Sequence, residues 1–576
     1  MVKRVLAGFV TCLMLVSPLT YQANADSVPG EQFSLQPPAD QVSSAGVVIE
    51  DSQFIKNHSV VLQGFTSANS QRGDIPLTLT DCTDYISPNC GPDKFYNYKA
   101  FFGSCETENS HDCVLAVTAK SSDGTVHKAK YVEDFPGKTQ YSFVGDPTAN
   151  LPNSSSSFIV EIATLPHSKG NLYLVTVNID GSKDFRQNRF SINQFSAGIF
   201  AVTIVNGKYV PPHPNSDVKN VLTVGYITNF RLTQDLSNDK NSGCAQASKT
   251  RCALAWPLPL DVEFSMTLKL QTKINGWIHG RLNEVSASIG MTADGDQLIS
   301  VSGKPVQVPS VFQWFHLDSL PTSVKNFYTN DPQFMTQGTR MGWNGRDFNS
   351  IIKDYIGYTI HDFPAAIAWY SAIGDKANSL ASAWSFRTIE SSNLPQQCNL
   401  NSNGLTGIVT TNSNMFVAMP PDFNSADQTL DYKVSSPHYL PDGSEFKGTY
   451  NLVMKSEYAR CLYGFTKAPV SATISVLSAD GTSQIPTTVL GERDGWLFLS
   501  ANNFTFSSPT LKVKLTQAAE PTPIATPSPT PSATTQAIAE TKKVIATKKT
   551  ITCVKGKTSK KITGLTPKCP SGFKKV

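Results

Sequence analysis

The sequence lacks the short motifs by which common enzyme classes are identified. It contains no G-x-S-x-G nucleophile elbow, no H-E-x-x-H zinc-binding helix, no Walker phosphate loop and no G-x-G-x-x-G fingerprint. The nine histidines are scattered, so no group of catalytic residues can be built around them. We identify no catalytic residue, cofactor or metal ligand, and we expect a binding or structural protein rather than an enzyme.

Charged residues are also scarce, at 16% of the chain against a usual share of about a quarter. Long apolar runs are missing beyond the N-terminus, because the longest, over 363–374, falls short of the roughly 20 residues that span a bilayer. A chain rich in Ser, Thr and Asn with few charges is more typical of an exported β protein than of a cytosolic enzyme. We expect no transmembrane helix in the mature chain.

A secretory signal peptide is predicted over residues 1–25. Two basic residues precede an apolar run over 5–16, and the small residues Ala23 and Ala25 suit the pockets of a signal peptidase. Cleavage is expected before Asp26. The mature protein is therefore predicted to be secreted and to reach a compartment in which disulfides persist.

Ten cysteines remain after the signal peptide, an even number that favours complete pairing. Pairing of near neighbours is the simplest arrangement, although crossed bridges from Cys82 to Cys113 and from Cys90 to Cys105 stay open at this point. No C-x-x-C motif supports a zinc site. The expected local bridges are Cys82/Cys90, Cys105/Cys113, Cys244/Cys252, Cys398/Cys461 and Cys553/Cys569.

The net charge of +4 conceals a separation of charge along the chain. Residues 541–576 contain eleven lysines and no acid, so residues 26–540 carry a net charge of −9. A lysine-rich tail of this kind can bind an anionic cell-wall polymer by charge attraction. Nucleic acid is not expected as a partner, because Phe573 is the tail's single aromatic residue and base stacking needs several.

The body of the chain shows the patterns of a mainly β protein. Residues 262–270 alternate between apolar and polar side chains, which predicts a strand with one buried face. Asp-Gly and Asn-Gly dipeptides, which favour tight turns, recur along the chain and predict hairpins, for example at Asp180-Gly181, Asn275-Gly276 and Asp494-Gly495.

Helical patterns are confined to the middle of the chain. Asp362 is expected to cap a helix over 363–373, and Asp375 a shorter helix that ends near Trp384. The segment 385–389 is expected to be extended. We therefore predict a multidomain, β-sandwich-like assembly with a small α+β region in its middle.

Composition suggests the following division of the chain. Five prolines between 521 and 531 indicate a disordered, semi-rigid Pro-rich linker after the last β domain. The predicted parts are a signal peptide (1–25), an N-terminal β region of one or two domains (26–230), a Trp-rich α+β region (231–396), a β-sandwich-like module (397–516), a Pro/Thr/Lys linker (517–550) and a basic two-cysteine tail (551–576).

Six of the seven tryptophans lie between Trp256 and Trp384. Exposed indoles stack on sugar rings, and Trp277 and Trp343 stand beside turn-forming residues, so they are the candidate glycan-binding residues. Trp369 and Trp384 are expected in the core. The alternative function is accordingly a secreted carbohydrate-active enzyme with its site in this region. Glu263, on the polar side of its strand, is not expected to be catalytic, because a solvated carboxylate stays ionised.

The C-terminal quarter resembles a known type of exported protein. The segments ITCVKGK (551–557) and PKCPSGFKK (567–575) are similar to the Lys-rich two-cysteine tails that follow Pro/Thr linkers in uncharacterised secreted actinobacterial proteins. The segments RCLYGF (460–465) and DGWLFLS (494–500) resemble a β module that precedes such tails. This resemblance implies export and a terminus that faces the cell wall, but it implies no activity, and residues 26–396 match no family known to us.

Overall fold

The computed structural model of the protein is mainly β with few helices. It describes residues 44–49, 62–66, 78–85, 95–183, 189–208, 244–325, 351–354, 363–389, 398, 404–466, 470–477, 483–484, 486–506, 510–517, 549–555, 558–564, 567–570 and 572–575. The predicted signal peptide, most of the predicted linker, Cys90, Asp362 and Trp343 lie outside these residues. Among the described residues, no helix is long and apolar enough to cross a membrane.

Residue contacts divide the chain into two compact units, Met1–Ala518 and Ala519–Val576. The division falls close to the predicted start of the Pro-rich linker. The first unit, the body, contains four of the five sheets, and the second contains a small sheet near the C-terminus. Each unit is described by itself below.

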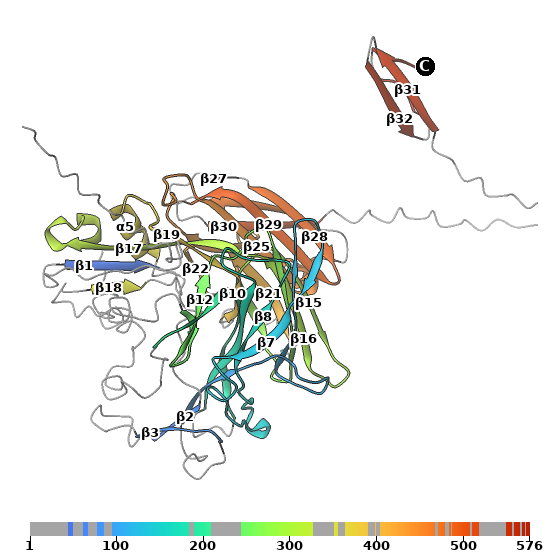
Figure 1. The fold of residues 1–576 in the computed structure, drawn as a ribbon. Helices are drawn as coiled ribbons and strands as arrows, with labels where there is room; N and C mark the ends of the chain where they lie inside the picture. The colour runs from blue at the N-terminus through green and yellow to red at the C-terminus, as the bar shows by residue number, and fades with distance from the viewer. Residues whose placement is uncertain are drawn as a thin grey trace, which may run out of the picture. The chain divides into compact units, whose positions relative to one another are not determined.

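One large sheet forms the centre of the body (Figure 1). Its main path runs through β28 (Thr487–Arg493), β29 (Trp496–Thr505), β25 (Lys447–Lys455), β21 (Leu405–Thr411), β14 (Gly276–Arg281), β20 (Ser385–Ile389), β10 (Ser191–Asn206), β9 (Leu172–Lys183), β4 (Phe95–Phe101), β2 (Leu62–Thr66) and β3 (Thr78–Asp81). Attached beside it are β7 (Lys130–Phe135), β8 (Ser157–Glu161), β11 (Cys244–Ala247) and β12 (Arg251–Trp256). Strands from all three predicted body regions therefore share one sheet, instead of each region forming a sheet of its own.

A five-stranded sheet packs on one face of the large sheet. Its strands, in spatial order, are β15 (Asn283–Met291), β16 (Gln297–Lys304), β13 (Glu263–Leu270), β5 (Cys113–Lys120) and β6 (Val126–Lys128). Phe264 and Met266 of β13 share a buried cluster with Ile278 and Ile408 of the large sheet. The predicted alternating strand is confirmed, because the even-numbered residues of β13 are buried and Glu263 and Ser265 are partly exposed.

A six-stranded sheet packs on the opposite face. It consists of β22 (Met415–Phe416), β24 (Thr429–Ser435), β30 (Thr510–Gln517), β26 (Val470–Leu477) and β27 (Ser483–Gln484), with β23 (Asp422–Asn424) beside β24. Trp277 and Val409 of the large sheet face this layer, whereas their neighbours Ile278 and Ile408 face the other. Successive strand residues point to opposite faces, so the large sheet is the middle layer between two cores. Helix α6 (Ser456–Tyr463) follows β25 and contributes Tyr458 to the second core.

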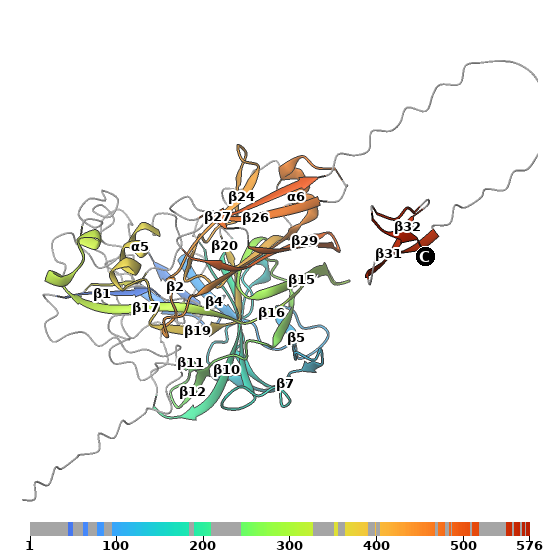
Figure 2. The same ribbon diagram turned by 90° about the horizontal axis from the view of Figure 1, so that it is seen from above.

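A smaller sheet and a helix form a third core. The sheet contains β18 (Ile351–Asp354), β1 (Ser44–Ile49), β17 (Val306–His316) and β19 (Ser379–Ala383), and Figure 2 shows β1 and β17 side by side near helix α5. Helix α5 (Phe363–Ala372) buries Phe363, Ala366, Trp369 and Tyr370 on one face. The helix predicted over 363–373 is thereby confirmed to within a residue at its end.

Two local predictions were wrong. The helix expected after Asp375 is strand β19, paired with β17, because Gly374 and Asp375 adopt left-handed backbone angles that end α5 and turn the chain. Asp180-Gly181 is not a turn but lies inside β9. A Cβ atom added to Gly181 would lie 2.4 Å from the Tyr98 ring, so this glycine permits close packing of β4 on β9.

Four of the predicted disulfides are present in the described residues. They are Cys105–Cys113, Cys244–Cys252, Cys398–Cys461 and Cys553–Cys569. The crossed alternative is excluded by the first of these bridges. Cys82 is also disulfide-bonded, and its predicted partner Cys90 lies outside the described residues.

Candidate functional sites

The second unit contains the predicted basic tail as a small folded sheet. Strand β31 (Lys549–Lys555) lies between β32 (Thr558–Gly564) and β33 (Lys574–Lys575), and both pairings are antiparallel. Figure 2 shows β31 and β32 as neighbouring strands. Cys553 is fully buried and bonded to Cys569, which ties the last segment of the chain to the central strand. We call residues 549–575 the tail sheet.

The tail sheet carries its charge on exposed side chains. In its described part, six lysines are exposed: Lys555, Lys560, Lys561, Lys568, Lys574 and Lys575. The sequence from 541 to 576 contains no acid that could neutralise them within the segment. Ammonium groups on flexible stems act as point charges, so this arrangement suits an extended anionic ligand without a fixed shape.

The structure corrects the prediction for Trp277. This side chain is only 1% exposed and lies between the large sheet and the six-stranded sheet, where its ring packs edge-on against Tyr458 at 5.8 Å. A Cβ atom on Gly407 would lie 2.4 Å from the indole, so the ring occupies a position for which the neighbouring strand has no side chain. An indole enclosed in this way has no open face for a sugar. Trp343 lies outside the described residues.

Other tryptophans of the middle region are also in the core. Trp369 and Trp384 are buried, as predicted, and Trp256 is 7% exposed. The Trp384 indole donates a hydrogen bond to the carbonyl of Gly303 at 2.8 Å. The concentration of tryptophan in this region is therefore explained, at these positions, by packing where sheets meet.

Glu263 lies on the partly exposed side of β13, as its strand pattern predicts. Its carboxylate is 3.5 Å from the Lys120 ammonium, and both side chains are about a third or more exposed. This is a solvated surface ion pair, which is an unsuitable environment for a proton-donating acid.

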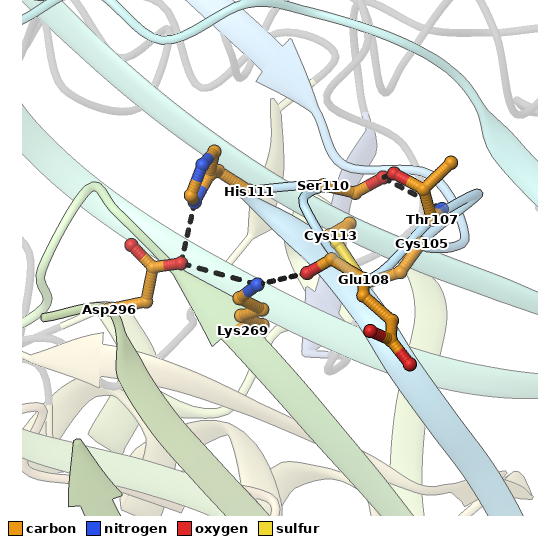
Figure 3. The surroundings of a disulfide bond; sticks show 8 residues. All are labelled: Cys105, Thr107, Glu108, Ser110, His111, Cys113, Lys269 and Asp296. Atoms are coloured by element: carbon orange, nitrogen blue, oxygen red, sulfur yellow. Dashed lines mark hydrogen bonds and ion pairs between the residues drawn. A yellow bond between two sulfur atoms is a disulfide. The ribbon is translucent and has the colours of Figure 1, made fainter. Parts of the chain in front are cut away.

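A group of polar side chains surrounds the Cys105–Cys113 bridge (Figure 3). The Asp296 carboxylate, only 3% exposed, is 2.6 Å from Nδ1 of His111 and 3.7 Å from the Lys269 ammonium. Lys269 also donates a hydrogen bond to the carbonyl of Glu108 at 2.6 Å. The loop closed by the disulfide is thus held to β13 and to the start of β16 by charged contacts.

Asp112 extends this group. Its two carboxylate oxygens accept hydrogen bonds from the backbone N–H and the hydroxyl of Thr272, each at 2.8 Å. Burial raises the pKa of Asp112 although these hydrogen bonds oppose the shift. Both Asp112 and Asp296 are engaged in contacts that position the loop, so the arrangement supports a structural role rather than a pair of catalytic carboxyls.

Sequence reasoning did not identify this group. Lys269 stands on the polar side of an alternating strand, which predicts an exposed lysine, yet it is 6% exposed. Its partners are distant in sequence. Asp296 directly precedes β16, and His111 lies in the loop closed by the Cys105–Cys113 bridge. The only signal was the nearby disulfide, which predicts a compact loop but not what packs against it.

A second group lies inside the body, between the large sheet and β22. The His279 ring stacks on the Phe416 ring at 3.5 Å, and the Arg281 guanidinium lies 4.7 Å from the centre of the same ring. Arg281 donates hydrogen bonds to the carbonyls of Thr411 and Ser413. Burial, and then the positive charges of Arg281 and Arg387, hold the pKa of His279 well below its usual range, so its imidazole is neutral.

The comparisons with known proteins assign no function. No protein-family model matches the sequence, and a search of curated proteins finds no match. Within the residues that the structure describes, no three His, Cys, Asp or Glu side chains are grouped closely enough to hold a metal ion.

Proposed function

We propose that the protein is exported and acts as a binding protein of a bacterial cell envelope, attached through its tail sheet to an anionic wall polymer. The observation that carries this proposal is the combination of six exposed lysines on a disulfide-tied sheet that forms a compact unit separate from the body. A folded, acid-free basic unit concentrates positive charge where a polyanion can reach it.

Two further features support export. The first 25 residues have the composition of a secretory signal, and four disulfides close loops along the rest of the chain. Disulfides of this kind form and persist in oxidising compartments. The proposed cleavage before Asp26 leaves an acidic body and a basic tail.

The charge distribution gives each part a role in this proposal. Residues 26–540, which carry a net charge of −9, are repelled by an anionic wall, whereas the lysine-rich tail is attracted to it. The sequence that joins the β body to the tail contains five prolines between 521 and 531, a composition typical of semi-rigid spacers. We propose that the tail provides attachment and that the β body is presented away from the wall.

The experiment compares two forms of the protein on isolated cell walls, the mature chain and a chain that ends at Glu540. At about 0.01 M salt the mature chain should be retained and the shortened chain released, and at about 1 M salt both should be released, because screening shortens from about 30 Å to about 3 Å. Equal retention of both forms at both salt concentrations would show that attachment does not use the tail.

A further inference from the structure

The two faces of the tail sheet differ. Residues directly opposite each other on paired strands have their side chains on the same face, and Cys553 of β31 is opposite Lys560 of β32 and Lys575 of β33. Thr552 is opposite Lys561, and Val554 is opposite Ser559 and Lys574. Because faces alternate along a strand, Lys560 and Lys575 lie on the Cys553 face, and Lys561 and Lys574 lie on the other.

The end of the chain packs on the Cys553 face, although Lys555, Lys560 and Lys575 of that face stay exposed. Cys569 is bonded to Cys553, and the Lys560 ammonium lies over the Phe573 ring at 5.6 Å. A Cβ atom on Gly572 would be 3.1 Å from the Lys555 ammonium. Cys569, Gly572 and Phe573 therefore pack on this face and form the small core of the tail sheet.

On the opposite face the central strand is only half-buried and lies between exposed donors. Lys561, Lys574 and Ser559 are exposed, and Thr552 and Val554 are half-buried along the central strand. Lys561 and Lys574 lie on the strands that flank β31, which places their backbones roughly 10 Å apart across the sheet. We call the residues Thr552, Val554, Ser559, Lys561 and Lys574 the open face.

We infer that the open face is the docking surface for a linear, phosphate-bearing polymer of the cell envelope. This inference rests on the proposed function and deepens it, by naming the face and the ligand chemistry. Phosphate oxygens accept hydrogen bonds from Lys, Ser and Thr side chains, which are the donors of this face. A row of phosphates can contact the Lys574 and Lys561 ammonium groups in turn while it crosses the hydroxyl of Thr552.

The test uses two matched double variants of the full mature chain, each of which removes two charges from β32 and β33. Lys561→Gln with Lys574→Gln alters the open face, and Lys560→Gln with Lys575→Gln alters the Cys553 face. Glutamine removes the charge and keeps two of the four methylene groups of lysine, so Lys560→Gln also gives up the ammonium contact with the Phe573 ring. Thiol titration without reductant checks that Cys553–Cys569 has formed in both variants.

Binding is measured with inorganic polyphosphate over a series of salt concentrations. The open-face variant should bind on the order of tenfold or more weakly at low salt. The slope of log affinity against log salt concentration should fall by about 2 in that variant, because two phosphate contacts are lost. The Cys553-face variant should stay within about threefold of the unaltered chain and keep its slope.

The outcomes separate this inference from the proposed function. Equal weakening by both double variants would overturn the inference, because binding would then depend on net charge and not on a face. Stronger weakening by the Cys553-face variant would also overturn it. If the chain that ends at Glu540 binds as well as the mature chain, the proposed function fails as well.

Discussion

At the scale of single residues, the pair of Asp375 and His438 links the turn after α5 to the segment that follows β24. The Asp375 carboxylate accepts hydrogen bonds from the backbone N–H and from the ring Nδ1 of His438. Asp375 stands at a left-handed position directly after α5, and its backbone carbonyl also accepts from Tyr439. The hydrogen bond to Asp375 raises the pKa of His438, against a smaller opposing effect of burial.

This pair predicts a pH-dependent contribution to stability. A raised folded-state pKa means that the stabilisation is fully present below the unfolded pKa of about 6.5 and is lost as the pH rises through the folded pKa. His438→Gln should therefore lower the free energy of unfolding by about 1 kcal/mol or less below pH ~6.5, since the pair is partly exposed. The difference from the unaltered protein should shrink above that pH.

Urea unfolding across this pH range measures the effect. His316→Gln is the matched control, because His316 lies 3.6 Å from Asp318 in a far more exposed pair and should change stability little at any pH. A His438→Gln deficit that stays constant or grows with rising pH contradicts the assigned ion pair.

Sequence patterns predicted the exposure of a residue where that exposure depends on its neighbours in the chain, and failed where it depends on distant strands. Glu263 was correctly placed on a solvated face, because its alternation with Phe264 is local information. The burial of Trp277 could not be derived, since it depends on Gly407 of a strand that is far away in sequence but adjacent in the sheet. The neutral, buried His279 was missed for the same reason.

At the scale of elements, the disulfides differ in the length of chain that they close. Cys398 and Cys461 are separated by 63 positions in sequence, and Cys105 and Cys113 by 8. In the chain-entropy account, a longer loop restricts the unfolded chain more strongly. The first bridge also joins α6 to a residue in the core between the large and six-stranded sheets.

Replacing both cysteines of a bridge by serine should therefore have unequal effects. We expect a loss of about 4 kcal/mol without Cys398–Cys461 and about 2.5 kcal/mol without Cys105–Cys113. The shorter loop is additionally held by Asp112, Lys269 and Asp296, so it should keep its position. Denaturant unfolding of the two double variants measures the difference, and an equal or reversed order would contradict this account.

Helices and strands were predicted correctly where the local sequence pattern and the packing of the folded chain favour the same structure. Strand β13 has an alternation that matches its burial, and helix α5 was predicted from an apolar run that follows Asp362. Strand β19 was predicted as helix because Asp375 was expected to cap a helix, whereas the strand conformation of this segment comes from pairing with β17. The pairing partner, not the intrinsic preference, decides such a segment.

At the scale of the whole molecule, the body is built around one shared sheet. Strand β14, from the predicted 231–396 region, pairs in parallel with β21, from the predicted 397–516 module. Linear composition identifies where turns and linkers occur, but it cannot identify strands that are distant in sequence and adjacent in a sheet. The charge and the disulfide of the tail were predicted, because both depend on residues close together in sequence, but its three-stranded sheet was not.

The shared sheet predicts that residues 397–516 do not form a stable domain when expressed alone. The fragment exposes the β21 edge that β14 covers, and it loses the Trp277 indole from its core. We expect aggregation or a broad, weakly cooperative unfolding transition by circular dichroism. A soluble fragment with a sharp transition would show that the six-stranded sheet and its partner strands are independent of the rest.

The central claim is that attachment depends on the tail and on charge. The most direct measurement is the affinity of the mature chain for isolated cell walls as a function of salt concentration. We predict a steep linear fall of log affinity with log salt, with a slope that reflects several lysine contacts, and no measurable binding by the chain that ends at Glu540. A slope near zero for the mature chain, or equal affinity of both chains, would contradict the account.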